Sequence, residues 1–388
     1  MIRLTRPFFD DAELQASARV IASGMLVQGA EVAAFEASVA RALSASTASS
    51  GLTCLAVTNG TVALELALAT TPCGDRVGVG TDDEVIVPAV TWPSPGHAAI
   101  LRGATPVLVD IDPHTWCVDV KAVEEALTPR TRAIIAIDQF GVPADVPGLR
   151  TRARDVDLIE DAACALGSSL DGVACGLLGD VATYSFHPRK VITTGEGGMV
   201  LTRDALRAER VQALRNHGQH SPGVFRAAGP NARLSELHAA LGVAQMQKLE
   251  TILARRRALA EVFQSGLALA WQRAPQGATV NHQTLGFVLP APRTGPFAGD
   301  RRGARDALLA ALRAQGVEAG ILSYALHRLP QFARFAVNGV RRFPVAEAVV
   351  DGGVAVPLHP LLGEAEVAQI LDALRREAGW ALGVEVFA

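Results

Sequence analysis

The chain has 388 residues, of which 49% are hydrophobic and 19% charged, and its formal net charge is −3. This is a globular composition with room for two domains, and the small charge without a basic run argues against a nucleic-acid partner. The sequence begins without the apolar run of a secretory signal and has no apolar stretch long enough to span a membrane, so we expect no membrane partner. The five cysteines form no C-x-x-C pair, which favours a reducing cytoplasm and argues against a metal site.

Apolar residues at helical spacing predict two helices within residues 10–43, joined by a loop at residues 23–29. Residues 44–53 are mostly small and polar and are expected to form a surface loop. These segments carry no candidate chemistry of their own.

A short apolar segment from Leu55 runs into a polar turn and then a strong helix. Thr58 and Asn59 are good N-cap residues, and the free N–H groups and dipole of a helix start favour an anion. Gly60 permits close approach of a phosphate, and Thr61 follows it. Because most capped helices bind no anion, an ordinary capped helix is the alternative here.

Residues 84–204 alternate between apolar strands and helices, which predicts a mostly parallel α/β sheet covered on both faces. In such sheets the ligand binds beyond the carboxyl ends of the strands. Trp92, Asp161 and Ser185 each lie at a predicted strand end, where one site could gather them. The expected strands are residues 84–92, 105–111, 132–138, 156–159, 181–186 and 198–202, and the expected helices are residues 94–102 and 119–127.

A leucine-rich stripe predicts one long helix over residues 231–265 that leads to a second, smaller α+β domain. The expected division is a large domain over residues 1–250 and a C-terminal domain over residues 251–388. In the second domain we expect strands at residues 284–289 and 317–323, helices at residues 302–315 and 364–377, and an extended segment at residues 354–360.

Lys190 is one of three lysines in the chain, and it stands between a predicted strand and the glycine-rich segment 195–198. A lysine held in this way is placed rather than solvated, although a surface lysine beside a hairpin has the same local pattern. A pyridoxal phosphate site needs such a lysine for a Schiff base and a carboxylate on the ring nitrogen. Lys190 and Asp161 supply these two groups.

The same site needs a phosphate cradle and a flat group stacked on the ring, and each has a candidate. Gly60, Thr61 and Ser185 would cradle the phosphate, and Trp92 would stack on the ring. Taken singly, Trp92 could be a core residue and Ser185 a locally satisfied hydroxyl. Their joint occurrence in this order on one α/β scaffold is what favours the cofactor site.

These motifs resemble those of the DegT/StrS-type sugar aminotransferases, which have the aspartate aminotransferase fold. The resemblance extends over nearly the whole chain. It is carried by residues 58–64, 160–163, 185–190, 195–198, 215–218, 231–237 and 357–360.

The resemblance implies a pyridoxal 5'-phosphate enzyme that moves an amino group from L-glutamate or L-glutamine to a keto sugar, most often nucleotide-linked, by a ping-pong mechanism. It also implies a homodimer with shared active sites, in which Asn231 reaches the phosphate of the partner's site. His217 lies in a loop expected near that site, and His327 falls where the family often has a substrate-side histidine.

One position departs from the family pattern. Cys164 stands where the family commonly has Gln or His bonded to the phenolic oxygen of the cofactor. A thiol is a weak donor, so either another group serves that oxygen or the ring electronics differ.

Several other functions share parts of this pattern. A keto cyclitol could replace the keto sugar as acceptor. The related sugar dehydratases carry histidine at the position of Lys190, which argues against dehydration. The complete set of site residues argues against a non-catalytic regulator, and the lack of a G-x-G-x-x-G after the first strand argues against a dehydrogenase.

Overall fold

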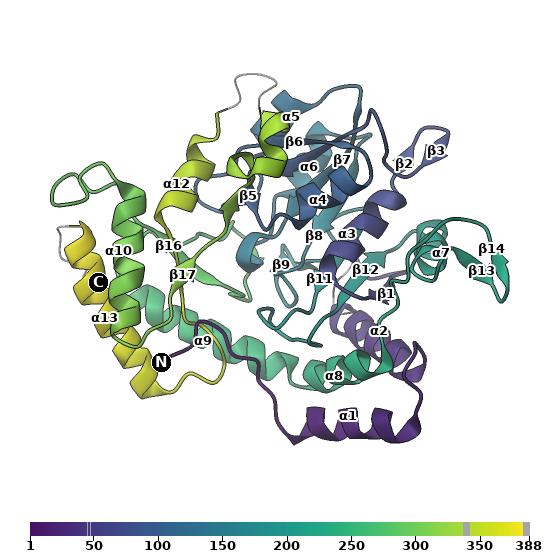
Figure 1. The fold of residues 1–388 in the computed structure, drawn as a ribbon, viewed down its shortest axis with the longest axis horizontal. Helices are drawn as coiled ribbons and strands as arrows, with labels where there is room; N and C mark the ends of the chain where they lie inside the picture. Colours follow the sequence, from purple (N-terminus) through teal and green to yellow (C-terminus); the bar gives the residue numbers. More distant parts are fainter. Residues whose placement is uncertain (45, 47, 337–341, 383–388) are drawn as a thin grey trace.

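The computed structural model describes residues 1–44, 46, 48–336 and 342–382 (Figure 1). Parts of two predicted segments, the loop at 44–53 and the C-terminal domain at 251–388, lie outside the described residues. Within the described ranges, no helix combines the length and the apolar character that crossing a bilayer requires.

The largest sheet has seven strands in the order β1-β12-β11-β8-β7-β4-β6. β12 runs antiparallel to both of its neighbours, and every pairing from β11 to β6 is parallel. The expected α/β class with a mostly parallel sheet is therefore confirmed. The strands are β1 (Thr53–Val57), β12 (Gly198–Thr202), β11 (Val181–Ser185), β8 (Asp157–Asp161), β7 (Thr131–Ile137), β4 (Glu84–Pro88) and β6 (Thr105–Val109).

Both faces of this sheet are buried. Successive residues of each strand point to opposite sides, and the side chains on each side pack in a hydrophobic cluster. In β7, Ile135 packs on one side in a cluster that includes α3 (Gly60–Ala69) and α4 (Ser94–Leu101). Ile134 packs on the other side, in a cluster with α5 (Val120–Ala126) and α6 (Val146–Arg152). α2 (Ala30–Leu43) and α8 (Glu236–Gln247) cover that second side near β1.

A smaller antiparallel sheet, in the order β16-β19-β17, forms the C-terminal part (Figure 1). The first residues of the chain join it, since Ile2 donates its N–H to the carbonyl of Gly316 at 2.7 Å and pairs with Val317. The elements of this part are β16 (Leu285–Val288), α10 (Arg301–Ala314), β17 (Gly320–Ile321), α12 (Pro344–Gly352), β19 (Gly353–Val356) and α13 (Glu364–Leu382).

The helix α9 (Leu249–Gly266) connects the two parts (Figure 1). Its first turns pack in the core beneath the large sheet through Ile252 and Leu253, and its last turns pack in the C-terminal core through Phe263. The predicted domain boundary at residue 250 falls in the first turn of this helix, and the division itself stays a prediction.

The predicted single helix at 231–265 is wrong in two respects. Residues 231–234 are extended, and Arg233 forms a β-bridge with Val57; α8 (Glu236–Gln247) then begins after the N-cap Ser235, whose hydroxyl accepts from the N–H of His238. The second difference is at Lys248, whose φ of −101° and ψ of 0° separate α8 from α9. Lys248 is held there by Glu13, at 2.6 Å.

Two predicted strands are also shorter than expected. The segment 84–92 divides at Ala89 because Val90 leaves the large sheet and pairs with Ala325 as β5 (Val90–Thr91) and β18 (Tyr324–Ala325). Of residues 317–323, only Gly320–Ile321 form a strand.

The other elements lie around this framework. They are α1 (Asp11–Ser23), α2 (Ala30–Leu43), β2 (Pro72–Cys73), β3 (Arg76–Val77), η1 (Gln139–Gly141), β9 (Ser169–Leu170), β10 (Val173–Ala174), α7 (Ala205–Leu214), β13 (Gln219–Ser221), β14 (Val224–Phe225), β15 (Ala278–Thr279), η2 (Leu326–Arg328), η3 (Pro330–Phe332) and α11 (Ala333–Ala336).

Candidate active site

A cavity of about 900 Å³ lies at the carboxyl ends of the parallel strands. Seven of the ten predicted site residues line it, and they come from the ends of β5, β8 and β11 and from the start of α3. They are Gly60, Thr61, Trp92, Asp161, Cys164, Ser185 and Lys190.

Lys190 lies in a turn that follows β11, where its N–H donates to the carbonyl of His187 at 2.8 Å. The returning loop is fixed beneath this turn because the hydroxyl of Thr193 donates to the carbonyl of Phe186 at 2.7 Å and accepts from the N–H of Gly195 at 2.9 Å. Gly195 has a φ of +83°, which a side chain would disfavour. The glycine segment thus returns the chain into β12 while Lys190 stays at the cavity.

Asp161 ends β8 and is almost fully buried, with 5% of its surface exposed. Its Oδ1 accepts the N–H of Ala163 at 3.1 Å. Burial raises the pKa of the Asp161 carboxyl, while the positive charge of Lys190 and the Ala163 N–H act in the opposite sense. A cation placed against this carboxylate would offset the cost of its burial.

The turn from β1 into α3 is packed tightly against the neighbouring strands. A Cβ on Gly60 would lie 2.9 Å from the Cβ of Ser185, and a Cβ on Gly198 would lie 2.3 Å from the carbonyl oxygen of Asn59. Asn59 caps the helix by accepting the N–H of Val62 at 2.9 Å. The start of α3 is therefore held beside the Ser185 hydroxyl, an arrangement suited to a phosphate.

The hydroxyls and the aromatic residue complete the cavity wall. Thr61 Oγ1 lies 2.7 Å from Ser94 Oγ, and both residues line the cavity. Trp92 is 59% exposed and makes an edge contact with Tyr324 at 5.6 Å between ring centroids. A flat ring entering the cavity could bury part of the Trp92 face.

Cys164 makes a direct contact with Lys190. The Nζ of Lys190 donates to the Sγ of Cys164 at 3.2 Å. The residue that departs from the family pattern thus contacts the amine of the predicted Schiff-base lysine.

Two carboxyl groups are buried behind this wall. Asp138 and Glu160 lie with Cys175 in a cluster in which a carboxylate oxygen of each acid and the Sγ of Cys175 are within 4.8 Å of one another. Glu160 accepts the N–H groups of Gly176 and Leu178 at 2.6 and 2.8 Å. Burial and then the charge of Glu160 hold the pKa of Asp138 well above its usual range, so Asp138 retains a proton that an exposed carboxyl would lose.

Among the described residues, three predicted site residues do not line this cavity: Asn231, His217 and His327. His327 is stacked on Phe343 and bonded to Glu347 at 3.2 Å. His217 is exposed and has a φ of +60°. Asn231 is exposed, and its Oδ1 accepts from Nε of Arg233 at 3.1 Å.

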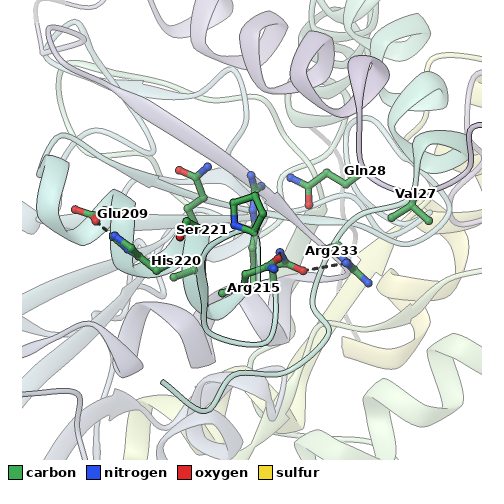
Figure 2. A pocket seen from close by; sticks show the side chains of 12 residues that line it. Val27, Gln28, Glu209, Arg215, His220, Ser221 and Arg233 are labelled. Carbon is green, nitrogen blue, oxygen red and sulfur yellow. Dashed lines mark hydrogen bonds and ion pairs between the residues drawn. The ribbon is translucent and has the colours of Figure 1, made fainter. Parts of the chain in front are cut away.

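A second, polar pocket of about 400 Å³ is lined by Arg233 and Asn216, among others (Figure 2). Asn231 is bonded to Arg233 and His217 directly follows Asn216, but neither of them lines this pocket. Arg233 lies at one side of it, and the pair Glu209–His220 lies at the other. Gln28 and Val27, from the loop between α1 and α2, also line this pocket.

Some cavity residues were not foreseen from the sequence. Leu4 and Thr5 come from the chain start, Gln283 and Thr284 precede β16, and Tyr324 follows β17. Their neighbours in sequence carry no motif, and only the folded arrangement brings them to Lys190.

The fold is that of pyridoxal-phosphate-dependent aminotransferases. More narrowly, the chain belongs to the DegT/DnrJ/EryC1/StrS aminotransferase family, whose model matches residues 7–375. Its cofactor is pyridoxal phosphate.

Three proteins illustrate the similarity. The GDP-perosamine synthase of Caulobacter vibrioides is 35% identical over 324 residues, covering 82% of this chain and 84% of that one. The UDP-N-acetyl-3-dehydro-alpha-D-glucosamine 3-aminotransferase of Acidithiobacillus ferrooxidans is 34% identical, covering 82% of each chain. The crystal structure of the aminotransferase TlmJ from Streptoalloteichus hindustanus superposes with a TM-score of 0.86 at 30% identity, covering 98% of this chain and 99% of that one.

Proposed function

We propose that the protein transfers an amino group from L-glutamate or L-glutamine to a nucleotide-linked keto sugar by a ping-pong mechanism. The observation that carries the proposal is the meeting of Lys190, Asp161 and the start of α3 at one cavity of about 900 Å³. Two similar enzymes are named for GDP- and UDP-linked sugars, which supports this class of acceptor.

The residues present fit the cofactor. The start of α3 with Gly60 and the Ser185 hydroxyl would hold the phosphate, and Lys190 would hold the aldehyde carbon. Asp161 would bind the ring nitrogen and keep it protonated. Once bound, pyridoxal phosphate supplies an aldehyde that condenses with amines and a protonated ring that accepts electrons.

Lys190 has a second task after the donor amine has taken its place. Its Nζ, kept at the cavity by the turn after β11, would be placed to take up the proton from the donor's α-carbon. Asp161, fixed by the Ala163 N–H at the end of β8, would face the ring nitrogen from the cavity wall. The keto acid leaves before the keto sugar enters, which gives ping-pong kinetics.

We also propose that two chains share their sites. Asn231 and His217 do not line the cavity of their own chain; Asn231 is bonded to Arg233 of the second pocket, and His217 follows Asn216 of that pocket. The loop at that pocket exposes Met25 by 69% and Val27 by 62%, and such apolar exposure is suited to a protein contact. Asn231 would then reach the phosphate in the partner's cavity, and His217 would lie near the substrate there.

The test is a matrix of donors and acceptors. Glutamate, glutamine and alanine are each combined with nucleotide-linked 3- and 4-keto sugars and with scyllo-inosose, and the amino product is detected by mass spectrometry. We expect product from one nucleotide-linked acceptor with glutamate or glutamine, and parallel lines in double-reciprocal plots. Turnover confined to scyllo-inosose would replace the sugar acceptor with a cyclitol, and intersecting lines would reject the ping-pong order.

A further inference from the structure

The contact between Lys190 and Cys164 joins two turns that follow neighbouring strands. Cys164 follows the end of β8 and Lys190 follows the end of β11, and these two strands pair in parallel as far as Asp161 and Thr183. Beyond that pairing, the 3.2 Å separation of Nζ and Sγ depends on the contacts that fix each turn.

The turn of Cys164 is held by Asn281, which is fully buried. The side-chain amide of Asn281 donates to the carbonyl of Cys164 at 2.8 Å and to that of Leu166 at 2.9 Å. The N–H of Asn281 donates to Ser168 Oγ at 3.0 Å. Because a buried amide of this kind costs free energy when a partner is lost, the turn is fixed firmly against residue 281.

The turn of Lys190 is held by Gln283, which lies two residues after Asn281 in the sequence. Its Nε2 donates to the carbonyl of Arg189 at 2.6 Å, directly before Lys190. Its N–H in turn donates to Oδ1 of Asn281 at 2.8 Å. The segment 281–283 therefore forms hydrogen bonds to both turns, and its residues Asn281 and Gln283 are hydrogen-bonded to each other.

Helix α9 fixes this segment from behind. Arg256 is buried, and its Nη2 donates to the carbonyls of His282 and Gln283 at 2.7 and 2.5 Å. Arg257 donates to the carbonyls of Gly167 and Val280 at 2.8 and 3.1 Å. The helix that connects the two parts of the molecule thus anchors the segment next to the Lys190 turn.

We propose that Asn281 and Gln283 are positioning residues that set the Lys190 amine against the Cys164 thiol. Gln283 acts through the Arg189 carbonyl, and Asn281 acts through the Cys164 carbonyl. For the loaded enzyme the inference rests on the proposed function, whereas the contact itself is present in the cofactor-free chain.

The first test uses the cofactor-free protein and the rate at which iodoacetamide alkylates Cys164, followed by peptide mass spectrometry. The other four cysteines are buried, so Cys164 is the accessible thiol. Lys190→Met removes the amine that contacts the thiol, so its alkylation rate is the reference for a Cys164 without this partner. Gln283→Met keeps the side-chain volume without the donor, and we expect its rate to move at least halfway from the wild-type value toward that of Lys190→Met.

The second test uses the cofactor-loaded protein without substrate. The pH midpoint of its visible absorption band reports the surroundings of the Lys190 nitrogen, and we expect Gln283→Met to shift it by about 0.5 to 1 pH unit. Gln315→Met is the matched control because Gln315 also donates its amide, to Glu377, away from the cavity. This control should retain the wild-type midpoint and alkylation rate.

If Gln283→Met does not fold, as judged by circular dichroism, Gln283→Glu keeps the length without the donor and is measured in the same way. A folded Gln283 variant with wild-type alkylation and midpoint overturns the proposal. A wild-type protein that binds no pyridoxal phosphate would instead overturn the proposed function, and the alkylation test would still decide the positioning role.

Discussion

The cofactor cavity and the second pocket differ in how much of a site one chain supplies. The cavity gathers Lys190, Asp161 and the start of α3 from a single sheet edge, with both the acid and the amine in place. The second pocket is lined by Arg233, which is bonded to Asn231, and among its lining residues in the described chain there is neither a lysine nor an aspartate. The difference agrees with our proposal that the first region performs the chemistry and that the second completes another chain's site.

We expect the largest loss of activity from a substitution of Asp161 in the cofactor cavity. Asp161→Asn removes the charge that, as we propose, keeps the ring nitrogen protonated, and we expect kcat to fall by about 10³-fold or more. Initial-rate kinetics with saturating donor measure this. Asp155→Asn changes an exposed aspartate and should leave kcat unaltered. Equal kcat values for the two variants would remove Asp161 from the chemistry.

Asn231→Asp tests whether the second pocket serves another chain. A carboxylate facing a phosphate is repelled, so we expect cofactor affinity to fall by about 100-fold. Mixing this variant with Lys190→Ala and refolding together should restore about a quarter of wild-type activity, because half of the dimers are mixed and each has one intact site. Mixed chains with no recovered activity would place each site within one chain.

Gly60→Ala tests the close packing of the phosphate cradle. The new Cβ would lie 2.9 Å from the Cβ of Ser185, so the start of α3 must shift. We expect the Kd for pyridoxal phosphate to rise by about 10-fold, as measured by fluorescence titration. Gly80→Ala is the control, since its Cβ would meet its nearest atom at 3.9 Å. Identical affinities in the two variants would contradict the assigned cradle.

Asp138→Asn should give the smallest effect, and on stability rather than on rate. Because the folded chain raises the pKa of Asp138, the folded state holds its proton more tightly, and wild-type stability is lost as pH rises above the ordinary carboxyl range. The variant has no such proton to lose. Its stability relative to wild type should increase by about 1 to 3 kcal/mol between pH 4 and pH 8 in urea unfolding. A difference independent of pH would show that Asp138 titrates normally.

The sequence was informative where a function depends on residue type and local order. A lysine before a glycine-rich turn, an aspartate at a strand end and a capped glycine at a helix start each have a local signature, and the structure brings them to one cavity. The parallel sheet followed from the alternation of strands and helices, and it is confirmed.

What could not be predicted depends on contacts between distant segments. At the division of the helix, Lys248 forms an ion pair with the distant Glu13, and no glycine or proline in the sequence marks the break. Asn281 and Gln283 reach the Cys164 and Lys190 turns across about a hundred residues, and their sequence resembles that of an ordinary loop. Asn231 was assigned from the family resemblance, and its role stays a prediction.

Borohydride reduction of the cofactor-loaded protein, followed by peptide mapping, tests the central claim most directly. The chain has three lysines, and Lys121 is exposed beside Glu125 while Lys248 is paired with Glu13. We predict a single cofactor-labelled peptide that contains Lys190, and no labelled peptide from Lys190→Ala. A label on Lys121 or Lys248, or a wild-type protein that acquires no label, would contradict the account.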